Sequence, residues 1–337
     1  MAKNITIKQI AEIAGVSVSA VSFVLNGKKG VSIDTRERVL KVINENNYTP
    51  NVNSRRLILK RSFNILIAIE LQNSPFNDFF YSSVMRYIVE YGSAYGYDTV
   101  LVPVTDSFSG SRLESALLEH NADGIIFLRD ISEELRKNIE KTGIPFVVVD
   151  SQKSEPPYPC IRGDYVLASY LSTKHLIENG HKKIAFIGSK QIDDFYKSTY
   201  AGFCKAMAEY GLEINSEWVK SSAKDEVSAR ICMKEIIEAK NKPTAAFCAG
   251  DLFAVSAMNY LQTNGYLLPQ DFSFSSIDDI SLAHYHFPSL TTVHIDDETM
   301  AKRAVDMLVK LMNNQETVTD VIVQSDNLII RNSVKNI

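Results

Sequence analysis

Residues 6–27 have the sequence TIKQIAEIAGVSVSAVSFVLNG, and this stretch decides the fold of the N-terminal part of the chain. Thr6 has the chemistry of a helix N-cap, and Gln9 three residues later completes a capping box. Apolar residues then recur at helical spacing as far as Ala14. The pattern predicts a short amphipathic helix that ends at Gly15.

A second helix is predicted directly after a tight turn. Ser17 can cap this helix, and the pair Asn26 and Gly27 favours the left-handed backbone that ends helices. Two short helices joined by a turn that contains glycine form a helix-turn-helix. A third helix should start after Ser32 and stop near Asn47, and three of its apolar side chains should point inward: Val39, Val42 and Ile43.

The second helix has two different faces when its residues are spaced by about 100° around the axis. One arc is apolar and should pack against the other helices, and it consists of Leu25, Val21 and Val24. The other arc spans about 140° and consists of Val18, Ser19, Ser22 and Phe23. This second arc is available for a DNA groove.

Charge divides the chain near residue 61. Residues 1–61 hold eleven Lys and Arg against four Asp and Glu, a net charge of +7. The remaining 276 residues hold 25 basic and 36 acidic side chains, a net charge of −11. Since a basic segment attracts polyanions, this division favours a nucleic-acid-binding head on an acidic body.

Short motifs follow one another along the whole chain in a specific order. In the head they are TIKQIA (6–11), AGVSVSAVS (14–22), VLNGK (24–28), VS (31–32), TRERVL (35–40) and YTPN (48–51). Later ones are DGII (123–126), GIP (143–145), HL (175–176), GHKKIAFIG (180–188), GF (202–203), DD (278–279) and LTTV (290–293). In this order the chain resembles the lactose-repressor/galactose-repressor family of bacterial transcription regulators.

The pattern of residues 62–337 predicts an α/β protein independently of the family resemblance. Short apolar runs, such as 65–69 and 124–128, alternate with helical stretches, such as 164–179, and this alternation builds parallel sheets covered by helices. Because about 275 residues are many for one such sheet, two lobes are expected. Residues 154–159 are the candidate crossing between them, and residues 289–292 look like a return crossing.

The resemblance implies the same organisation in more detail. We expect an all-α helix-turn-helix domain at 1–50, a hinge helix at 51–61, and a two-lobed core like that of periplasmic binding proteins at 62–337. Lobe 1 should comprise about 62–160 plus 293–323. Lobe 2 should comprise about 161–290 plus 324–337.

DNA contacts are predicted from these family positions. Phosphates should be held by short hydroxyl and amide side chains near helix N-termini, where backbone N–H groups point at an anion. These residues are Thr6, Ser17, Ser22, Asn26, Ser32 and Thr35. N-capping is the alternative role, and we expect Thr6, Ser17 and Ser32 to serve both as caps and as phosphate contacts. Base edges should be met by Val18, Ser19 and Phe23.

Phe23 departs from the family, which usually has Arg at this position. Arginine reads guanine with two hydrogen bonds, whereas phenylalanine offers only apolar contact, for example to a thymine methyl. The operator sequence therefore cannot be copied from relatives that carry Arg. The alternative is that the ring packs back on the head.

Residues 51–60 contain neither Gly nor Pro and can form about two and a half helical turns. They match the family's hinge helix, which orders on DNA. The resemblance places Leu57 where the family inserts a leucine into the minor groove, a wedge that kinks the duplex. Arg55 and its neighbours supply positive charge there.

The effector site is predicted between the lobes. Asp150 and Asp278 each follow a strand at family positions that bind the small molecule, and strand ends are where ligands sit in parallel sheets. Helix capping is the alternative for Asp278. Thr199 and Gly250 depart from the family, which has Arg and Asn there. Either the effector is not a standard sugar or other groups take over, the candidates being Arg129, Arg162 and Lys224.

Other chemistries have weaker support. The four cysteines show no metal or redox spacing, which favours buried thiols in a cytoplasmic protein. No signal segment or membrane helix is visible. Common catalytic motifs are absent, and His284 and His286 lack the further ligands that zinc requires. We therefore expect no cofactor, no metal and no enzyme activity.

These patterns predict a cytoplasmic, sequence-specific DNA-binding regulator, most simply a repressor. Its partners should be double-stranded DNA with a near-palindromic operator, a small metabolite such as a sugar or sugar derivative, and a second copy of the chain, with no membrane. Two other classes stay open. One is a regulator gated by a partner protein, and the other is an enzyme or solute-binding protein on the same core.

Overall fold

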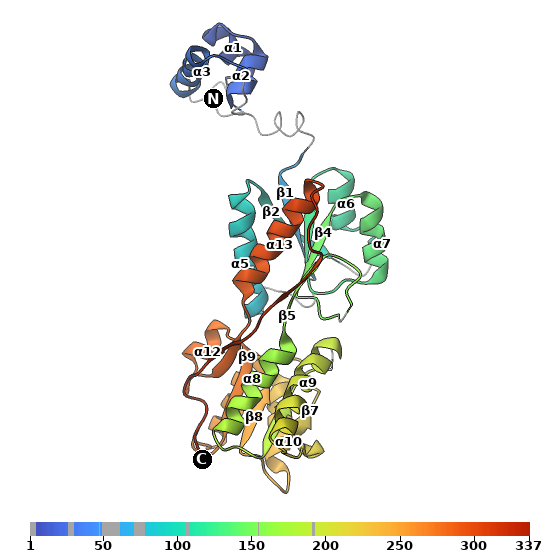
Figure 1. Cartoon of the computed structure of the whole chain (residues 1–337), viewed down its shortest axis with the longest axis vertical. Helices are drawn as coiled ribbons and strands as arrows, with labels where there is room; N and C mark the ends of the chain where they lie inside the picture. Colours follow the sequence, from blue (N-terminus) through green and yellow to red (C-terminus); the bar gives the residue numbers. More distant parts are fainter. Residues whose placement is uncertain are drawn as a thin grey trace. The chain divides into compact units, whose positions relative to one another are not determined.

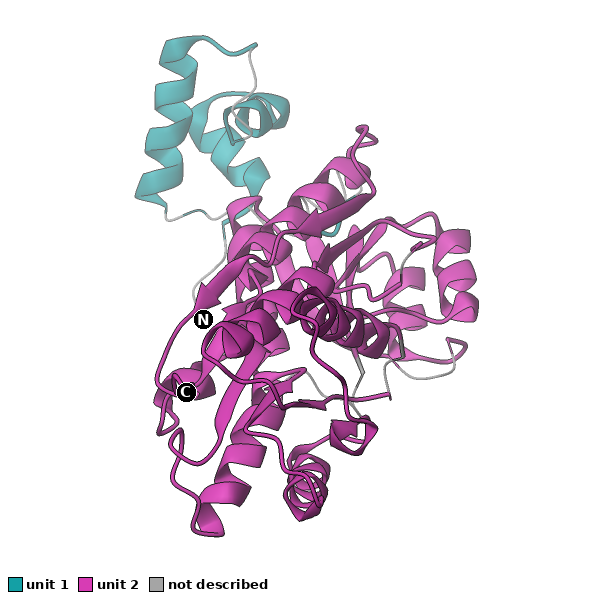
Figure 2. Cartoon of the chain, turned by 60° about the horizontal axis from the view of Figure 1, so that its bottom comes forward, with its two compact units in different colours: residues 1–62 teal, residues 63–337 magenta. Residues whose placement is uncertain are grey.

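The structure is a computed structural model that describes residues 5–25, 30–46, 48, 61–70, 78–104, 108–153, 155–190 and 193–337. The chain forms two compact units, Met1–Ser62 and Phe63–Ile337, which are coloured separately in Figure 2. We call the first unit the head and the second the core. Asn26 lies outside the described residues. Residues 51–60 of the predicted hinge helix, which include Arg55 and Leu57, also lie outside them.

The head is the predicted helix-turn-helix with a third helix. Thr6 and Gln9 form the capping box at the start of the first helix, and Gly15 ends it with a left-handed backbone (φ 64°). Buried side chains from all three helices make one small core, to which the second helix contributes Val21 and Val24. The helices are α1 (Ile7–Ala14), α2 (Val18–Leu25) and α3 (Ile33–Glu45).

The core contains two six-stranded sheets, one in each lobe. The sheet of lobe 1 is parallel throughout, in the order β11-β5-β4-β3-β1-β2. Its strands are β1 (Asn64–Glu70), β2 (Asp98–Val104), β3 (Gly124–Leu128), β4 (Phe146–Val149), β5 (Cys160–Gly163) and β11 (Asp320–Val323).

The sheet of lobe 2 has the order β12-β10-β9-β8-β6-β7. Its strand pairs are parallel, except that β12 runs antiparallel to β10. The strands are β6 (Ile184–Ile187), β7 (Val219–Lys220), β8 (Ala245–Cys248), β9 (Ser273–Asp278), β10 (Thr291–His294) and β12 (Asn327–Ile329).

Helices cover both faces of each sheet, because the strands are apolar on both sides. In β1, Ile65 and Ile67 pack toward α5 and α13, whereas Leu66 and Ala68 pack toward α6 and α7. Figure 1 shows these helices around the lobe 1 sheet. They are α5 (Phe79–Ala94), α6 (Arg112–Leu118), α7 (Glu133–Thr142) and α13 (Asp297–Met312).

Lobe 2 is covered in the same way, with α8 packed against α9 and α10 packed against α11. The helices of this lobe are α8 (Tyr165–Glu178), α9 (Asp193–Glu209), α10 (Glu226–Glu238), α11 (Asp251–Thr263) and α12 (Ser281–Tyr285), with a 3₁₀ turn at Ser216–Trp218.

The chain passes between the lobes at three places, and the first two differ from the sequence prediction. The first crossing follows β5, which belongs to the lobe 1 sheet, so the predicted crossing at 154–159 and the start of lobe 2 at 161 were placed too early. The predicted return at 289–292 was also too early, because β10 is still in the lobe 2 sheet. Strands of four residues next to Gly or Asp give too little apolar pattern to be recognised.

Among the described residues, no single helix is long and apolar enough to cross a membrane. Taken together, α1 and α2 have the length and apolar composition of a membrane span, but the two helices are bent by 103° at their junction. Both helices contribute buried side chains to the core of the head, which explains their apolar content.

Candidate nucleic-acid interface and interlobe cluster

Three of the hydroxyl groups predicted to hold phosphates, those of Thr6, Ser17 and Ser32, cap helices in the head. The Oγ1 atom of Thr6 accepts from the N–H of Gln9 at 3.4 Å, and the Oγ atom of Ser17 accepts from the N–H of Ala20 at 3.1 Å. Ser32 caps α3 and also donates to the Oγ1 atom of Thr35 at 2.9 Å. These side chains therefore lie at helix N-termini, where backbone N–H groups can also receive an anion.

The outward face of α2 holds the residues predicted to meet bases. Val18 is 41% exposed and Phe23 is 39% exposed, while Ser19 is also exposed and Ser22 is partly buried. The ring of Phe23 approaches the chain after α2, since a Cβ atom added at Gly30 would lie 3.4 Å from it. Phe23 thus has one side on the head and one side in solvent.

In the core, the carboxylate of Asp150 joins side chains from both lobes. It follows β4 of lobe 1 and is buried. Tyr81 of α5, also in lobe 1, donates its hydroxyl to Oδ2. Tyr165 of α8, in lobe 2, donates its hydroxyl to Oδ1 at 2.5 Å, and the amide of Gln152 donates to the same oxygen at 2.8 Å.

Burial governs the ionisation of this group. It raises the pKa of Asp150 to about 6, although the hydrogen bonds from Tyr165 and Tyr81 and the charge of Arg129 act in the opposite direction. Burial likewise raises the pKa of both tyrosines well above the usual value, so both remain hydroxyl donors at neutral pH. Asp150 is therefore the shared acceptor of the group.

Arg129 lies beside these residues in a strained backbone position (φ 80°). Its guanidinium is 3.2 Å from a carboxylate oxygen of Asp78 and lies over the ring of Tyr81, 4.4 Å from the ring centre. Its Nε atom is buried and has no hydrogen-bond partner among the described residues. Arg129 is thus near the predicted site but is already engaged with lobe 1.

Asp278 ends β9 of lobe 2 and also has a positive φ, at 116°. Its carboxylate accepts a hydrogen bond from the backbone N–H of Asp251 but from no side chain among the described residues. Burial raises its pKa well above the usual value, and the charges of Asp251, Asp78 and Asp150 raise it further. Asp278 therefore has unused acceptor capacity, and it lies close enough to Asp78 and Asp150 of lobe 1 for their charges to affect it.

We call Asp78, Tyr81, Asp150, Tyr165 and Asp278 the interlobe cluster. Gly250 adjoins it, because a Cβ atom added there would lie 3.5 Å from Oδ2 of Asp278. The φ of Gly250 is 135°, a conformation that side chains rarely allow. The departure from Asn at this position thus has a backbone reason.

Asp251 follows Gly250 and was missed by the sequence analysis. It is fully buried and accepts from Thr292 at 2.7 Å, from the N–H of Ile280 at 2.8 Å, and from the hydroxyl of Ser276. Burial raises its pKa to about 7. Only its place at the start of a helix after glycine could have indicated it.

Helix capping does not explain the pair Asp278 and Asp279. The helix that follows is capped at Ile280 without a side-chain hydrogen bond. Asp279 instead binds Arg331 at 2.6 Å and lies 3.3 Å from Nδ1 of His294. Asp279 therefore connects the end of β9 to the segment after β12 and to the last residue of β10, where the return crossing begins.

Three of the predicted effector residues do not join the cluster. Thr199 is fully buried, and its hydroxyl donates to the carbonyl of Phe195 in its own helix at 3.0 Å. Arg162 binds Asp320 on the neighbouring strand at 2.7 Å. Lys224 is exposed before α10, and no contact among the described residues joins it to Asp150 or Asp278. The structure thus brings Asp150, Asp278, Arg129 and Gly250 together, without the other three.

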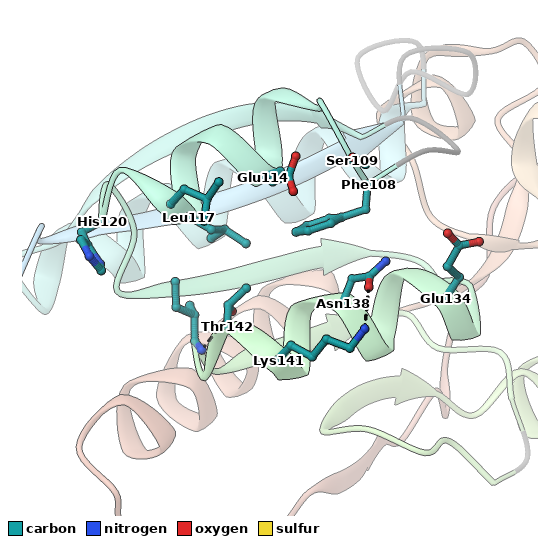
Figure 3. A pocket seen from close by; sticks show the side chains of 11 residues that line it. Phe108, Ser109, Glu114, Leu117, His120, Glu134, Asn138, Lys141 and Thr142 are labelled. Carbon is teal, nitrogen blue, oxygen red and sulfur yellow. Dashed lines mark hydrogen bonds between the residues drawn. The ribbon is translucent and has the colours of Figure 1, made fainter.

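A separate groove of about 580 Å³ lies in lobe 1 between α6 and α7 (Figure 3). Phe108 points into it, and Glu114 and Lys141 give it charges of both signs. Lys141 is held by Asn138 at 3.3 Å. None of the predicted effector residues lines this groove.

Among the described residues, no group of His, Cys, Asp and Glu has an arrangement that could hold a metal ion. The ring of His286 lies 3.1 Å from the carbonyl of Pro288 and 3.1 Å from the side chain of Asn259. It therefore packs within lobe 2.

A basic three-helix head on a two-lobed α/β core defines a class of ligand-responsive regulators. Residues 6–51 match the model of bacterial regulatory proteins of the lacI family, and residues 173–334 match a periplasmic binding protein-like domain. The HTH-type transcriptional repressor PurR of Vibrio parahaemolyticus is 32% identical, with 98% of this chain and 99% of that protein covered. PurR of Pasteurella multocida is 31% identical over the same shares.

Solved structures show the same fold. The lac repressor dimer bound to operator and the anti-inducer ONPF has a TM-score of 0.82 at 23% identity, covering 99% of this chain and 100% of that one. The complex of the transcriptional regulator CelR with cellobiose has a TM-score of 0.72 at 25% identity, covering 98% and 99%. The chain belongs to the lacI family of bacterial regulatory proteins, and it is a DNA-binding transcriptional regulator with an effector-binding core.

Proposed function

We propose that this regulator is a homodimeric repressor that binds a near-palindromic operator through its head and responds to a small metabolite held at the interlobe cluster. The protein works on DNA in the cytoplasm and needs no enzyme activity. The relatives are transcriptional repressors by name, which supports repression here. The CelR structure holds cellobiose, which supports a small-molecule site in the same core.

One observation carries the effector part of the proposal. Asp278 is the carboxylate of the cluster with unused acceptor capacity, and it lies opposite Asp78 and Asp150 of the other lobe. Apart from the backbone N–H of Asp251, no donor among the described residues satisfies this buried carboxylate, and a ligand that supplied further donors would be bound favourably. A polyhydroxyl or amino compound has suitable donors.

A thermal-shift screen tests the effector proposal. Sugars, amino sugars, nucleosides and phosphorylated sugars are added to the full chain, because a ligand at a hundred times its Kd adds about 2.7 kcal/mol of stability. The shift should vanish in Asp278→Ala. It should persist in Glu316→Ala, which removes an exposed carboxylate at a distant turn.

The result of the thermal-shift screen distinguishes a small-molecule effector from a partner protein, and the interlobe cluster from another binding site. If no compound of the panel shifts the melting temperature, while capture from cell extract yields a stoichiometric protein that changes operator binding, the regulator is gated by a partner protein. If a compound shifts the wild type and Asp278→Ala equally, it binds outside the interlobe cluster.

The DNA part is tested by selection of operators from random duplexes. Enriched sites should be near-palindromic, with half-sites about one helical turn apart. Phe23→Ala should relax the preference at one position of each half-site by about 1–3 kcal/mol if the ring contacts a base. A lower melting temperature with unchanged selectivity would instead assign the ring to the core of the head.

Affinity should also fall steeply with salt. Each phosphate that the basic head neutralises adds about 0.9 to the slope of log K against log salt. An affinity that hardly changed between low and physiological salt would contradict the role assigned to the charge of the head.

A further inference from the structure

Tyr165 contacts residues of both lobes. Its ring belongs to lobe 2: it is the first residue of α8 and packs edge-on against Phe195 of α9, with ring centres 4.9 Å apart. Its hydroxyl reaches Asp150 in lobe 1 at 2.5 Å. Both residues are buried, so this hydrogen bond is shielded from water and connects the lobes beside the first crossing.

We propose that the Tyr165 hydroxyl is a latch that holds lobe 2 on the Asp150 carboxylate, and that an effector releases the latch by supplying its own donor to Asp150. This inference rests on the proposed function and names the regulation of that site. It assigns different tasks to the two aspartates that the sequence analysis treated as a pair.

The hydrogen bonds that Asp150 already accepts support this assignment. Its carboxylate already accepts hydrogen bonds from Tyr81, Tyr165 and Gln152. A carboxylate has about four acceptor sites, so a further ligand group can bind fully only by displacing one of these donors. Tyr81 and Gln152 belong to the same lobe as Asp150, and the hydroxyl of Tyr165 is the donor that departs when lobe 2 moves.

The same contacts define the chemistry of the effector. A group that takes the place of a tyrosine hydroxyl must donate a hydrogen bond, as a hydroxyl or an N–H does. A phosphate or carboxylate would instead meet the like charges of Asp78, Asp150 and Asp278. The guanidinium of Arg129, which lies beside the cluster, is already held by Asp78 and by the ring of Tyr81. We therefore infer a neutral or cationic effector rather than an anionic one.

Coupling then follows from differential binding. An effector that bonds to Asp150 in place of Tyr165 has a higher affinity for the unlatched arrangement, so its binding shifts the lobes toward that arrangement. The backbone next to the latch is close-packed, since a Cβ atom added at Gly163 would lie 3.3 Å from the Tyr165 ring. The ring of Tyr165 therefore lies directly against the end of β5, next to the crossing.

Two phenylalanine substitutions provide a matched test. Tyr165→Phe removes the hydrogen bond between lobes, and Tyr81→Phe removes a hydrogen bond to the same carboxylate within lobe 1. Both keep their rings. Hydrogen exchange of the full-length protein without ligand is followed at the crossing, where the N–H of Asp164 donates to the carbonyl of Val323 at 3.2 Å.

Tyr165→Phe should speed exchange at this crossing on the order of tenfold, because a hydrogen bond to a charged group is lost between the lobes. Tyr81→Phe should leave the crossing within about twofold of wild type, since its lost bond is internal to one lobe. Equal acceleration in both variants, or none in Tyr165→Phe, would overturn the latch. Small-angle scattering gives a second measure, in which only Tyr165→Phe should expand.

A ligand-binding experiment distinguishes failure of the latch from failure of the effector proposal. Neutral and amino sugars are compared with their phosphorylated forms as thermal-shift probes. If crossing exchange obeys the prediction while no probe binds, the latch stands and the effector proposal fails. If only phosphorylated probes bind, and Tyr165→Phe binds them with unchanged affinity, the latch and its ligand class are wrong while the effector proposal survives.

Discussion

Asp150 and Asp278 occupy equivalent places in the two lobes, at the carboxyl ends of central parallel strands, yet their surroundings differ. Asp150 is surrounded by donors from its own protein, two tyrosine hydroxyls and one amide. Asp278 accepts from a backbone N–H and faces other carboxylates. Equivalent positions in a repeated architecture thus have different hydrogen bonding: the lobe 1 carboxylate is satisfied by donors of its own protein, and the lobe 2 carboxylate has unused acceptor capacity.

The strongest test of this comparison is the stability of the two alanine variants. Asp150→Ala leaves two buried hydroxyls and an amide without their acceptor, at about 1–3 kcal/mol for each group. We expect a loss of about 3–5 kcal/mol in the free energy of unfolding. Asp278→Ala should be neutral or stabilising, because it removes a buried charge next to Asp251, Asp78 and Asp150. Denaturant titration of both variants measures the difference, and equal losses would break the comparison.

Much of this arrangement could be predicted from the sequence. The helix-turn-helix, its capping residues and the buried face of α2 follow from local patterns, which depend on neighbours within four residues. Asp150 and Asp278 could be placed at strand ends for the same reason. The contacts of Asp150 could not, because Tyr81 and Tyr165 are separated from it by 69 and 15 residues and lie in ordinary helical contexts.

Arg162 and Gly250 also show that contacts between residues distant in the sequence cannot be predicted from local patterns. Nothing in the sequence near Arg162 shows that Asp320 would lie on the neighbouring strand, 158 residues later. The conformation of Gly250 was equally hidden, because a glycine before a helix has many common explanations. Tertiary pairing therefore decided which of the chemically suitable residues were available for a ligand.

Thr199→Arg sharpens the comparison by restoring the usual family residue. Thr199 is fully buried with its hydroxyl turned into its own helix, so a guanidinium there lacks space and a partner. Overpacking and desolvation should cost about 2–4 kcal/mol. Thr199→Val is the control for the loss of the hydroxyl alone, and the loss of its hydrogen bond to the carbonyl of Phe195 should cost about 0.5–1.5 kcal/mol. If the arginine variant is as stable as wild type, its side chain reaches the acidic groups and this position remains part of the site.

Gly250→Ala probes the backbone on which Asp278 depends. The φ of 135° at Gly250 is unfavourable for any side chain, and the added Cβ atom would lie 3.5 Å from Oδ2 of Asp278. We expect a loss of about 1–3 kcal/mol, with Gly211→Ala as a control for a left-handed glycine that has open space around its Cβ position. Similar losses in both variants would show that strain alone accounts for the effect and that Asp278 is not disturbed.

The smallest expected effect concerns Asp279, which adjoins Asp278 but is paired like Asp150. The carboxylate of Asp279, 3.3 Å from Nδ1 of His294, raises the pKa of His294. In turn, His294 and Arg331 keep the pKa of Asp279 low despite its burial. Because the folded pKa of His294 exceeds its unfolded value near 6.5, its stabilising contribution is complete below that value and disappears as pH rises through the folded pKa. Since His294 is one-third exposed, the contribution should stay below about 1 kcal/mol.

His294→Gln isolates this contribution in the difference between the unfolding free energies of variant and wild type at each pH. The difference is needed because His175 and His181 have pKa values lowered by burial and change stability in the opposite direction over a similar range. The wild-type advantage should be present at pH 6 and lost toward pH 8. An advantage independent of pH would show that His294 is neutral in the folded protein, so that the pairing of Asp279 depends on Arg331 alone.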